Sequence, residues 1–521
     1  MASVKTTTPA GHGEVLTSPD YEQWAGLARA NAVAVRGWDF DVCGLPAAAL
    51  RDSARREALA RAGEFSARLG VPVRDTPHEP GMIVMTGHQP ELYHPGVWVK
   101  DFLLQRLADE IGAAAIDLVV DSDGFDAVEI HSPCFKPEVR VCRAYLAVGT
   151  TDGCFACAPV PSVPDLERFC EAGAEQISSL PAPALGHHFA LFCEKLMAAA
   201  GDAANLAELV TFARRRYEAS ASTDYLELPV TSMARSRAFA TLLAHIARDA
   251  VGFAAAYNDA LADFRDRTGT RNPAQPFPDL RIEGDLIELP VWHLAGARRT
   301  VWARTGDVPA LVVDGEMLCE LADCASAPDT VFVSSLVPAP KALMLTLFAR
   351  LFVADFFIHG VGGGRYDSVT DDVIRRYFGV EPPTFAVASM TMYLPLGARV
   401  VTDTDIEAAS MALNRMRHNP DQAIDQVEFD SSDERGRAQG VADEKARLIA
   451  AIASPGADKK ALGRRIREVN QELGDLMAPY RLVLQEELDE LLRMREASEI
   501  LTDRTYPFCY WSPSEVADKA R

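Results

Sequence analysis

The sequence has few basic residues relative to its acidic ones. Its 521 residues include 52 lysines and arginines against 74 aspartates and glutamates, which gives a formal net charge of −22 at pH 7. A protein that grips nucleic acid needs clustered lysine and arginine side chains for the phosphates. We therefore expect no nucleic-acid partner, although a local basic site for a small anionic molecule is compatible with this composition.

Long apolar runs are also absent. The sequence has no stretch of about 18 uncharged apolar residues, and its N-terminus carries no apolar segment of signal-peptide length. These absences predict a cytoplasmic protein that has no membrane partner.

Cysteine is sparse, with ten residues in the chain, which argues against a disulfide framework and predicts mostly buried free thiols. Cys154 and Cys157 have the two-residue gap that can place two thiolates on one zinc ion. The neighbouring Cys134, Cys142 and Cys170 do not repeat this spacing. Cys154 and Cys157 are therefore weak metal candidates, and we do not expect zinc as a cofactor.

The segment Met82 to Lys100 has the pattern of a strand, a loop and a helix. An apolar run of strand length ends at Gly87, a short segment with two histidines follows, and the spacing from Val97 to Ile111 predicts a helix. In an open parallel sheet, ligands bind outside the carboxyl ends of the strands, and free N–H groups at the next helix start favour anions. This segment predicts a phosphate or carboxylate site.

A second apolar run, Ala115 to Val120, breaks into the acidic loop Asp121 to Asp126. A strand, a helix and a second strand make a βαβ unit, which builds a parallel sheet and places the two strand ends side by side. The carboxylates of Asp121 and Asp123 could orient a substrate amine or hold Mg²⁺. Acidic Asp-Gly turns are also common on protein surfaces, so a structural role stays open.

A third apolar run, Val353 to Ile358, ends in the glycine-rich segment His359 to Gly364. Glycines after a strand can serve a tight turn, or they can let backbone N–H groups approach a phosphate, with Arg365 adding a charge-assisted fork. The lysine of a P-loop and the dinucleotide-binding spacing are both absent. The position at the end of a parallel strand favours the ligand-binding interpretation.

The last quarter of the chain is charged and helical. Apolar residues from Leu462 to Leu491 recur in alternating steps of four and three, which predicts the seam of an antiparallel coiled coil. A single helix of roughly 35 residues would be too long to lie on a compact core, so we expect it to pair with the preceding helices and with another subunit. The aromatic tail, Thr505 to Trp511, should return to the sheet.

These patterns divide the chain into five predicted segments. They are the first half of an α/β core with a parallel sheet (1–138), an inserted helical and small β region (139–328), the second half of the core (329–400), a helical coiled-coil domain (401–500) and a tail that packs back on the core (501–521). Inside the insertion, Glu288 to Trp292 and Thr300 to Arg304 predict an antiparallel ribbon. The run Thr330 to Ser335 is predicted to resume the sheet as a strand.

The order of these segments resembles the bacillithiol biosynthesis cysteine-adding enzyme family, BshC. The resemblance is carried by Thr86 to Tyr93, the acidic strand end Asp121 to Asp126, the stretch His359 to Gly364, the C-terminal helices and the aromatic tail. It implies a Rossmann-like core, a coiled coil that makes a homodimer, and a nucleotide-dependent type of ligase that joins cysteine to glucosaminyl-malate. His88 stands where that family has glutamine, so the chain resembles a divergent relative.

Candidate site residues follow from the three strand ends. His88 and His94 are predicted to act in catalysis, because a protonated imidazole can stabilise charge that develops on a transferred phosphate. The predicted catalytic set is completed by Gln89, Asp121 and Asp123, and the predicted cofactor-binding set is Thr86, Gly87, Lys100, Gly362, Gly363, Gly364 and Arg365. A lysine in the position of Lys100 is more often solvated, but it could neutralise a phosphate.

We therefore expect a ligase that condenses a small carboxylate-bearing substrate with an amine, using ATP or another nucleotide and Mg²⁺. Two alternatives stay open. One is a nucleotide-binding enzyme of the same fold with an unrelated substrate. The other is a non-catalytic coiled-coil assembly protein whose α/β domain binds a metabolite.

Overall fold

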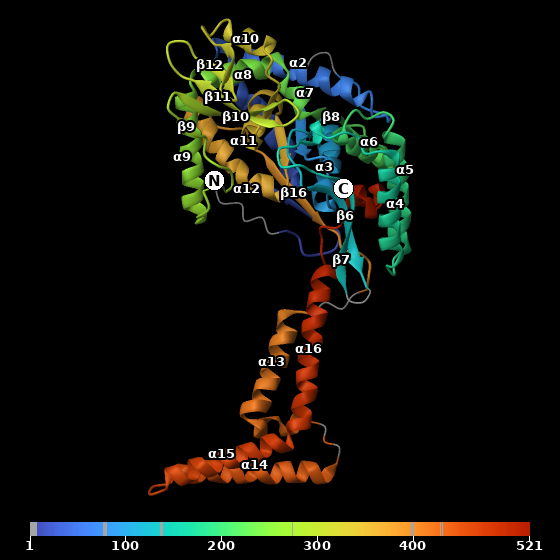
Figure 1. Ribbon diagram of the computed structural model, residues 1–521, viewed down its shortest axis with the longest axis vertical. Coiled ribbons are helices and arrows are strands. Elements are labelled where there is room, and N and C mark those ends of the chain that lie inside the picture. The colour runs from blue at the N-terminus through green and yellow to red at the C-terminus, as the bar shows by residue number, and fades with distance from the viewer. Residues whose placement is uncertain are drawn as a thin grey trace. The chain divides into compact units, whose positions relative to one another are not determined.

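The computed structural model describes residues 8–76, 81–135, 139–273, 275–397, 401–427, 429 and 431–521. The chain divides into two compact units. The larger unit contains Met1–Cys134, Val141–Leu394 and Arg504–Arg521, and the smaller unit contains Phe135–Arg140 and Pro395–Asp503. Figure 1 shows an α/β architecture in the larger unit and helices in the smaller one.

A six-stranded mixed sheet lies at the centre of the larger unit. Its strands, in spatial order, are β1 (Glu14–Ser18), β16 (Ala386–Thr391), β15 (Phe356–His359), β4 (Ile83–His88), β5 (Ala114–Val119) and β8 (Leu226–Pro229). The last five are parallel, and β1 pairs with β16 in the antiparallel sense. The carboxyl ends of the five parallel strands therefore lie along one edge.

The order of the parallel strands changes direction between β4 and β15. From β4 the chain moves outward through β5 to β8, whereas β15 pairs with the opposite side of β4 and is followed by β16. Such a switch point leaves a crevice at the carboxyl edge where ligands bind in open α/β sheets. In this chain the switch point lies between the strand ends at His88 and His359.

Helices cover the sheet because most side chains of its parallel strands are apolar and buried. Ile83, Met85 and Ile116 pack in one core with helices α2, α8, α9 and α12, while α3 packs on β4, β5 and β16. The helices of this unit are α1 (Trp24–Ala34), α2 (Ala47–Ser66), α3 (Pro95–Ile111), α4 (Val163–Ser178), α5 (Pro183–Ala199), α6 (Leu206–Glu218), α7 (Val230–Ala234), α8 (Arg237–Arg248), α9 (Ala250–Thr268), α10 (Ala327–Val333), α11 (Ala342–Phe348), α12 (Val361–Val373) and α17 (Pro513–Lys519).

A second sheet is antiparallel and confirms the predicted ribbon. Its strands are β13 (Glu316–Glu320), β12 (Ala310–Val313), β11 (Arg298–Arg304), β10 (Leu286–Leu294), β14 (Pro338–Pro340) and the short β9 (Ile282–Glu283). Two further pairs are small: β2 (Asp41–Val42) with β3 (Leu45–Pro46), and β6 (Ala127–Cys134) with β7 (Arg140–Val148).

Two expectations for the middle of the chain are wrong. The region 139–328 is not simply an insertion, because it supplies β8, which pairs with β5 at the edge of the main sheet. The run Thr330 to Ser335 does not resume the sheet as a strand, because Thr330 to Val333 belongs to α10. Pro328 lies in the first turn of α10, where a proline is pre-organised for a helix start.

The aromatic tail returns to the larger unit, as expected. The backbone N–H of Phe508 donates to the Tyr93 carbonyl at 2.7 Å, and the Tyr217 hydroxyl donates to the Trp511 carbonyl at 2.7 Å. The Phe508 ring also contacts Trp98 of α3. The end of the chain is thus part of the core that supports the β4–α3 segment.

The smaller unit consists of helices that pack in pairs. They are α13 (Asp403–His418), α14 (Ser432–Ile452), α15 (Lys459–Leu476) and α16 (Ala478–Leu501). Helix α13 packs against α16, and α14 packs against α15. The predicted single helix through Leu462 to Leu491 is wrong, since it breaks at Met477, where Pro479 in the first turn of α16 lacks the N–H that continuation would require.

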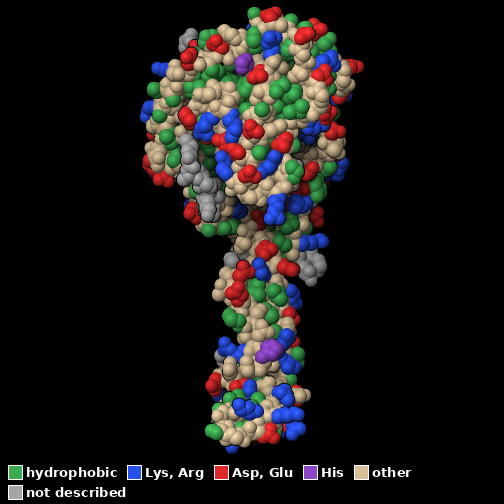
Figure 2. All heavy atoms as spheres, turned by 90° about the vertical axis from the view of Figure 1, so that its left-hand side faces the viewer, with side chains coloured by type: hydrophobic (Ala, Val, Ile, Leu, Met, Phe, Trp, Pro, Cys, Tyr) green, Lys and Arg blue, Asp and Glu red, His purple; other side chains and the backbone are tan. Residues whose placement is uncertain are grey.

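Among the described residues, no single helix is long and apolar enough to cross a membrane. Helices α8 and α9 are long and apolar enough only when they are taken together, and the chain bends by 92° between them. Most of its apolar side chains are buried in the core of the larger unit. Figure 2 shows acidic and basic side chains interspersed over the face in view.

Candidate functional site

A cavity of about 440 Å³ lies at the switch point of the main sheet. Residues from separate predicted segments line it together: Gly87, His88, Gln89 and His94 before α3, Lys100 within α3, Asp123 after β5, and Gly362 and Gly363 after β15. They are more than 270 residues apart at the extremes, yet the parallel strands bring their ends to one edge. The sequence-predicted segments therefore converge on one cavity.

Helix α3 begins with its own cap. His94 occupies the N-cap position, and its Nδ1 atom accepts a hydrogen bond from the Gly96 N–H at 3.0 Å. Gly96 permits this geometry, because a Cβ atom there would lie 2.6 Å from the Met390 carbonyl oxygen. The first N–H groups of α3 are thus partly occupied, which weakens the expectation that this helix start holds an anion by itself.

Lys100 is not the solvated lysine that the sequence favours. Its side chain is almost fully buried, and its Nζ atom donates to the Gly87 carbonyl at 2.8 Å. Burial lowers the pKa of Lys100, while the carboxylates of Asp101 and Asp117 oppose that shift. The cavity therefore has an amine fixed in its wall, close to the end of β4, and the two neighbouring carboxylates favour its protonated form.

His88 does not carry the positive charge expected from the sequence. Burial, together with the nearby positive charge of Lys100, lowers the pKa of His88 to about 3. The ring is neutral at physiological pH, and its Nδ1 atom lies 3.1 Å from the Gln89 carbonyl, where a ring N–H can donate. That tautomer leaves Nε2 as a hydrogen-bond acceptor, so His88 can orient a ligand but cannot stabilise negative charge as an imidazolium.

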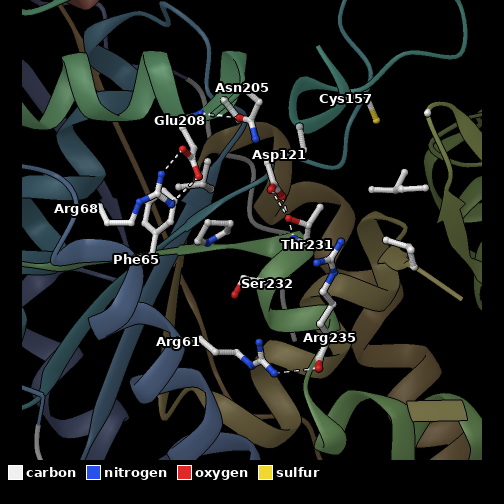
Figure 3. A pocket seen from close by; sticks show the side chains of 17 residues that line it. Arg61, Phe65, Arg68, Asp121, Cys157, Asn205, Glu208, Thr231, Ser232 and Arg235 are labelled. Atoms are coloured by element: carbon white, nitrogen blue, oxygen red, sulfur yellow. Dashed lines mark hydrogen bonds and ion pairs between the residues drawn. The ribbon is translucent and has the colours of Figure 1, made fainter. Parts of the chain in front are cut away.

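The two predicted aspartates have different environments. Asp123 lines the cavity and accepts a hydrogen bond from Gln89 Nε2 at 2.8 Å, which joins the loops after β4 and β5. Asp121 instead accepts hydrogen bonds from the Thr231 N–H at 2.9 Å and from the Thr231 hydroxyl, and Figure 3 shows these contacts at a second cavity. Asp121 is therefore outside the switch-point cavity, contrary to its predicted catalytic role there.

The glycine-rich segment is the first turn of α12 and not a loop. Gly360 is the N-cap, with no side-chain hydrogen bond, and Gly362 and Gly363 line the cavity. The first N–H groups of a helix have no partner within the helix. In this uncapped turn they can donate to a ligand, because glycine has no side chain that would block a ligand from the backbone. The uncapped start of α12 suits an anion better than the capped start of α3 does.

Three other predicted cofactor-binding residues have structural or peripheral positions. Thr86 is fully buried, and its hydroxyl donates to the Ile358 carbonyl at 2.7 Å, tying β4 to β15. A Cβ at Gly364 would collide with Val387 of β16, so this glycine permits close packing. Arg365 is exposed and does not line the cavity.

Sequence reasoning missed a histidine–aspartate pair at the same cavity. His359, the last residue of β15, lines the cavity, and its Nε2 atom lies 2.9 Å from Asp367 Oδ2. Burial favours the protonated acid, but Arg350 and His359 together hold the pKa of Asp367 below its usual range. The pattern offered one signal: a histidine immediately before the glycines, with an aspartate two helical turns further on.

Arg504 was missed as well, because it lies far along the chain, between α16 and the aromatic tail. It lines the cavity, and its guanidinium donates to the Ser389 hydroxyl at 2.9 Å and to the Met390 carbonyl at 2.8 Å. The cavity thus receives positive charge from Arg504, with the Lys100 amine beside it, and Asp123 is the one carboxylate among its described lining residues.

A buried charge network supports the sheet beside this cavity. Arg214 of α6 contacts Asp101 at 2.8 Å, Asp117 at 3.0 Å and Glu227 at 2.7 Å. Burial and the neighbouring Glu227 raise the pKa of Asp117 to about 7. The network joins α3, β5, β8 and α6, so it fixes the strands whose ends form the site.

Cys154 and Cys157 are joined by a disulfide, and so are Cys134 and Cys142. These four residues are therefore not the free thiols that the sparse cysteine content predicts. The pairing leaves Cys154 and Cys157 without thiolates for a metal ion. Within the described parts of the chain, no group of three or more histidine, cysteine, aspartate or glutamate side chains is arranged to hold a metal ion.

No protein-family model and no curated protein sequence matches this chain. A relationship to the BshC family therefore stays a prediction, which rests on the sequence pattern.

Proposed function

We propose that this chain is a Rossmann-like enzyme that binds a nucleotide at the switch-point cavity and condenses a small carboxylate-bearing substrate with an amine, as the resemblance to BshC implies. The single observation that carries the proposal is the cavity itself. It joins the ends of β4, β5 and β15 at the position where doubly wound α/β folds bind their ligands. Its volume, about 440 Å³, lies within the range of small-molecule sites.

The charges around the cavity fit a nucleotide phosphate. The uncapped start of α12 offers backbone N–H donors at Gly362 and Gly363, and Lys100 and Arg504 add positive charge. Mg²⁺ commonly binds through one or two carboxylates together with substrate phosphates. Asp123 is in a position to serve as such a carboxylate, so the residues present fit a nucleotide with its metal ion.

His359 is the best-placed group to accept a proton from an attacking amine. When the amine nitrogen bonds to an activated carboxyl carbon, the amine must lose a proton and the activating group must leave with its electron pair. A histidine oriented by a buried carboxylate is suited to take that proton. The leaving group's negative charge would be stabilised by Lys100, Arg504 and the start of α12.

Polar residues near the end of β4 would orient the substrates in this scheme. Neutral His88 presents an acceptor to the cavity, and the Gln89–Asp123 pair fixes the relative position of two strand ends. The orienting role of His88 does not require a protonated ring.

The helices of the smaller unit would form the coiled-coil homodimer that the sequence pattern and the resemblance predict.

The proposal is tested by thermal shift and by product analysis on the full chain. We expect ATP with Mg²⁺ to raise the melting temperature, and ATP, cysteine and glucosaminyl-malate together to yield a nucleotide product detectable by chromatography. His359→Asn should abolish the product but keep the thermal shift. His187→Asn, an exposed histidine of α5, is the matched control and should keep both.

Each alternative outcome has a defined meaning. A thermal shift without any product from this or other amine and carboxylate pairs would favour a non-catalytic metabolite-binding protein. Turnover with different substrates would favour an enzyme of the same fold with unrelated chemistry. No shift with any nucleotide would overturn the proposed cofactor.

A further inference from the structure

A second cavity, of about 480 Å³, opens at the carboxyl ends of β5 and β8. Val119 and Asp121 contribute from the end of β5, and Pro229 and Thr231 from the end of β8. It shares no lining residue with the switch-point cavity, because the turn from Asp121 to Asp123 lies between them: Asp121 faces one cavity and Asp123 the other. Figure 3 shows this second cavity from close by.

Two arginines without an ion-pair partner among the described residues give this cavity positive charge. Arg61 of α2 donates to the Arg235 carbonyl at 3.0 Å, and the Arg235 side chain extends from the end of α7. Within the described part of the chain, neither guanidinium has a carboxylate partner at ion-pair distance. Arg68 differs, since Glu208 neutralises it through hydrogen bonds of 2.8 and 2.6 Å.

The acids of the cavity only partly balance its arginines. Both oxygens of Glu208 accept hydrogen bonds from Arg68, which neutralises that pair. Both oxygens of Asp121 accept hydrogen bonds from neutral Thr231, and Asp121 also interacts electrostatically with Arg235. The two positive charges of Arg61 and Arg235 exceed the single charge of Asp121, which leaves them able to bind an external anion, and Figure 3 shows both arginines and Ser232 around the one cavity.

The rest of the lining favours an organic body attached to that anion. Phe65, Leu294 and Val337 contribute apolar surface, and Ser232 and Asn205 contribute neutral polar groups. The volume is larger than an inorganic ion requires and lies within the range of small-molecule sites. A guanidinium fork recognises the planar or tetrahedral oxygens of carboxylate and phosphate groups.

We propose that this cavity is a second ligand site, which binds a small organic anion with its phosphate or carboxylate group on Arg61 and Arg235 and its less polar body against Phe65 and Leu294. The site does not depend on the proposed function, because none of its residues belongs to the switch-point cavity.

Calorimetric titration of the full chain at constant ionic strength tests the proposal. The probes are phenyl phosphate, benzoate and inorganic phosphate. We expect phenyl phosphate or benzoate to bind more tightly than inorganic phosphate, and the tighter of the two identifies the preferred anionic group. Arg61→Gln and Arg235→Gln should each weaken binding by about tenfold or more, since each removes a charge-assisted hydrogen bond.

Two controls locate the probe. Arg56→Gln removes the same charge from an exposed position of α2 outside the cavity and should leave binding unchanged. Gly362→Ala alters only the switch-point cavity and should also leave it unchanged. The proposal is overturned if no probe binds, if Arg56→Gln weakens binding as much as Arg235→Gln does, or if Gly362→Ala abolishes it.

Discussion

His359 Nε2 lies 2.9 Å from Asp367 Oδ2, and this contact joins the end of β15 to the body of α12 beside the switch-point cavity. Asp367 is buried and is also held by Arg350, whose Nη1 atom lies 2.5 Å from the same carboxylate oxygen. His359 lines the cavity, whereas Asp367 stands behind it. The two side chains are thus at ion-pair distance, where a carboxylate can orient a histidine.

Asp367→Asn should therefore lower kcat without weakening nucleotide binding. The expected loss in kcat is about a hundredfold, because an oriented proton acceptor contributes on the order of 10²–10⁴ to a rate. Steady-state kinetics and a nucleotide titration measure the two quantities separately. A proportional loss in both kcat and nucleotide affinity, with a collapsed melting temperature, would assign Asp367 to structure alone.

Thr86→Val should affect stability and not binding. The hydroxyl of Thr86 donates to the Ile358 carbonyl inside the sheet, so its removal should cost about 1 kcal/mol of unfolding free energy. Urea unfolding measures that cost, and titration with ATP should give the wild-type dissociation constant. A weakened ATP affinity at unchanged stability would return Thr86 to the cofactor-binding set.

Asp117 should make stability fall as the pH rises. Its folded pKa, about 7, exceeds its ordinary value of 3.8, so the folded state holds the proton more tightly than the unfolded state does. The stabilisation is complete below about pH 4 and is lost as the pH rises through 7. Urea unfolding from pH 5 to 7 should show a steeper decline for the wild type than for Asp117→Asn, by up to about 1.4 kcal/mol per pH unit. Parallel declines would contradict this assignment.

The helices of the smaller unit should form the predicted dimer through exposed apolar side chains. Leu482 and Val483 of α16 are 63% and 60% exposed, and Figure 2 shows hydrophobic side chains among charged ones on this unit. Such exposed apolar residues favour association. Light scattering after gel filtration should give a dimer for the wild type and a monomer for the double variant Leu482→Glu, Val483→Glu.

The control for the dimer is Val251→Glu. Val251 lies on α9 of the larger unit and is 58% exposed, so its replacement adds a charge at similar exposure without touching the smaller unit. This variant should stay dimeric. A wild-type protein that is monomeric at every concentration would remove the homodimer from the account.

The main features of the site could be predicted because parallel strands end at one edge. The run before Gly87, the acidic loop at Asp123 and the glycines at Gly362 each follow a strand, and this local pattern sufficed to place them together. Their side-chain environments could not be predicted. Whether His88 is charged depends on burial beside Lys100, and the separation of Asp121 from Asp123 depends on a turn and on the partner Thr231.

Elements defined by tertiary pairing were missed for a related reason. The strand β8, Leu226–Pro229, is only four residues long and lies among helices, so pairing with β5 identifies it and local pattern does not. Arg504 reaches the cavity only because the aromatic tail packs back near Tyr93. The helix break at Met477, in contrast, had a local signal in Pro479, which the heptad spacing outweighed.

The most direct test of the central claim is the dissociation constant of ATP, with Mg²⁺, for the wild type, Gly362→Ala and Gly26→Ala, measured by calorimetry. Both glycines lie in the first turn of a helix with open space around the added Cβ, so both variants should gain about 0.5–1 kcal/mol of stability. Only Gly362 lines the cavity. The account predicts ATP binding by the wild type and Gly26→Ala, and about tenfold weaker binding by Gly362→Ala. Absence of ATP binding by the wild type, or equal affinities for all three proteins, would contradict it.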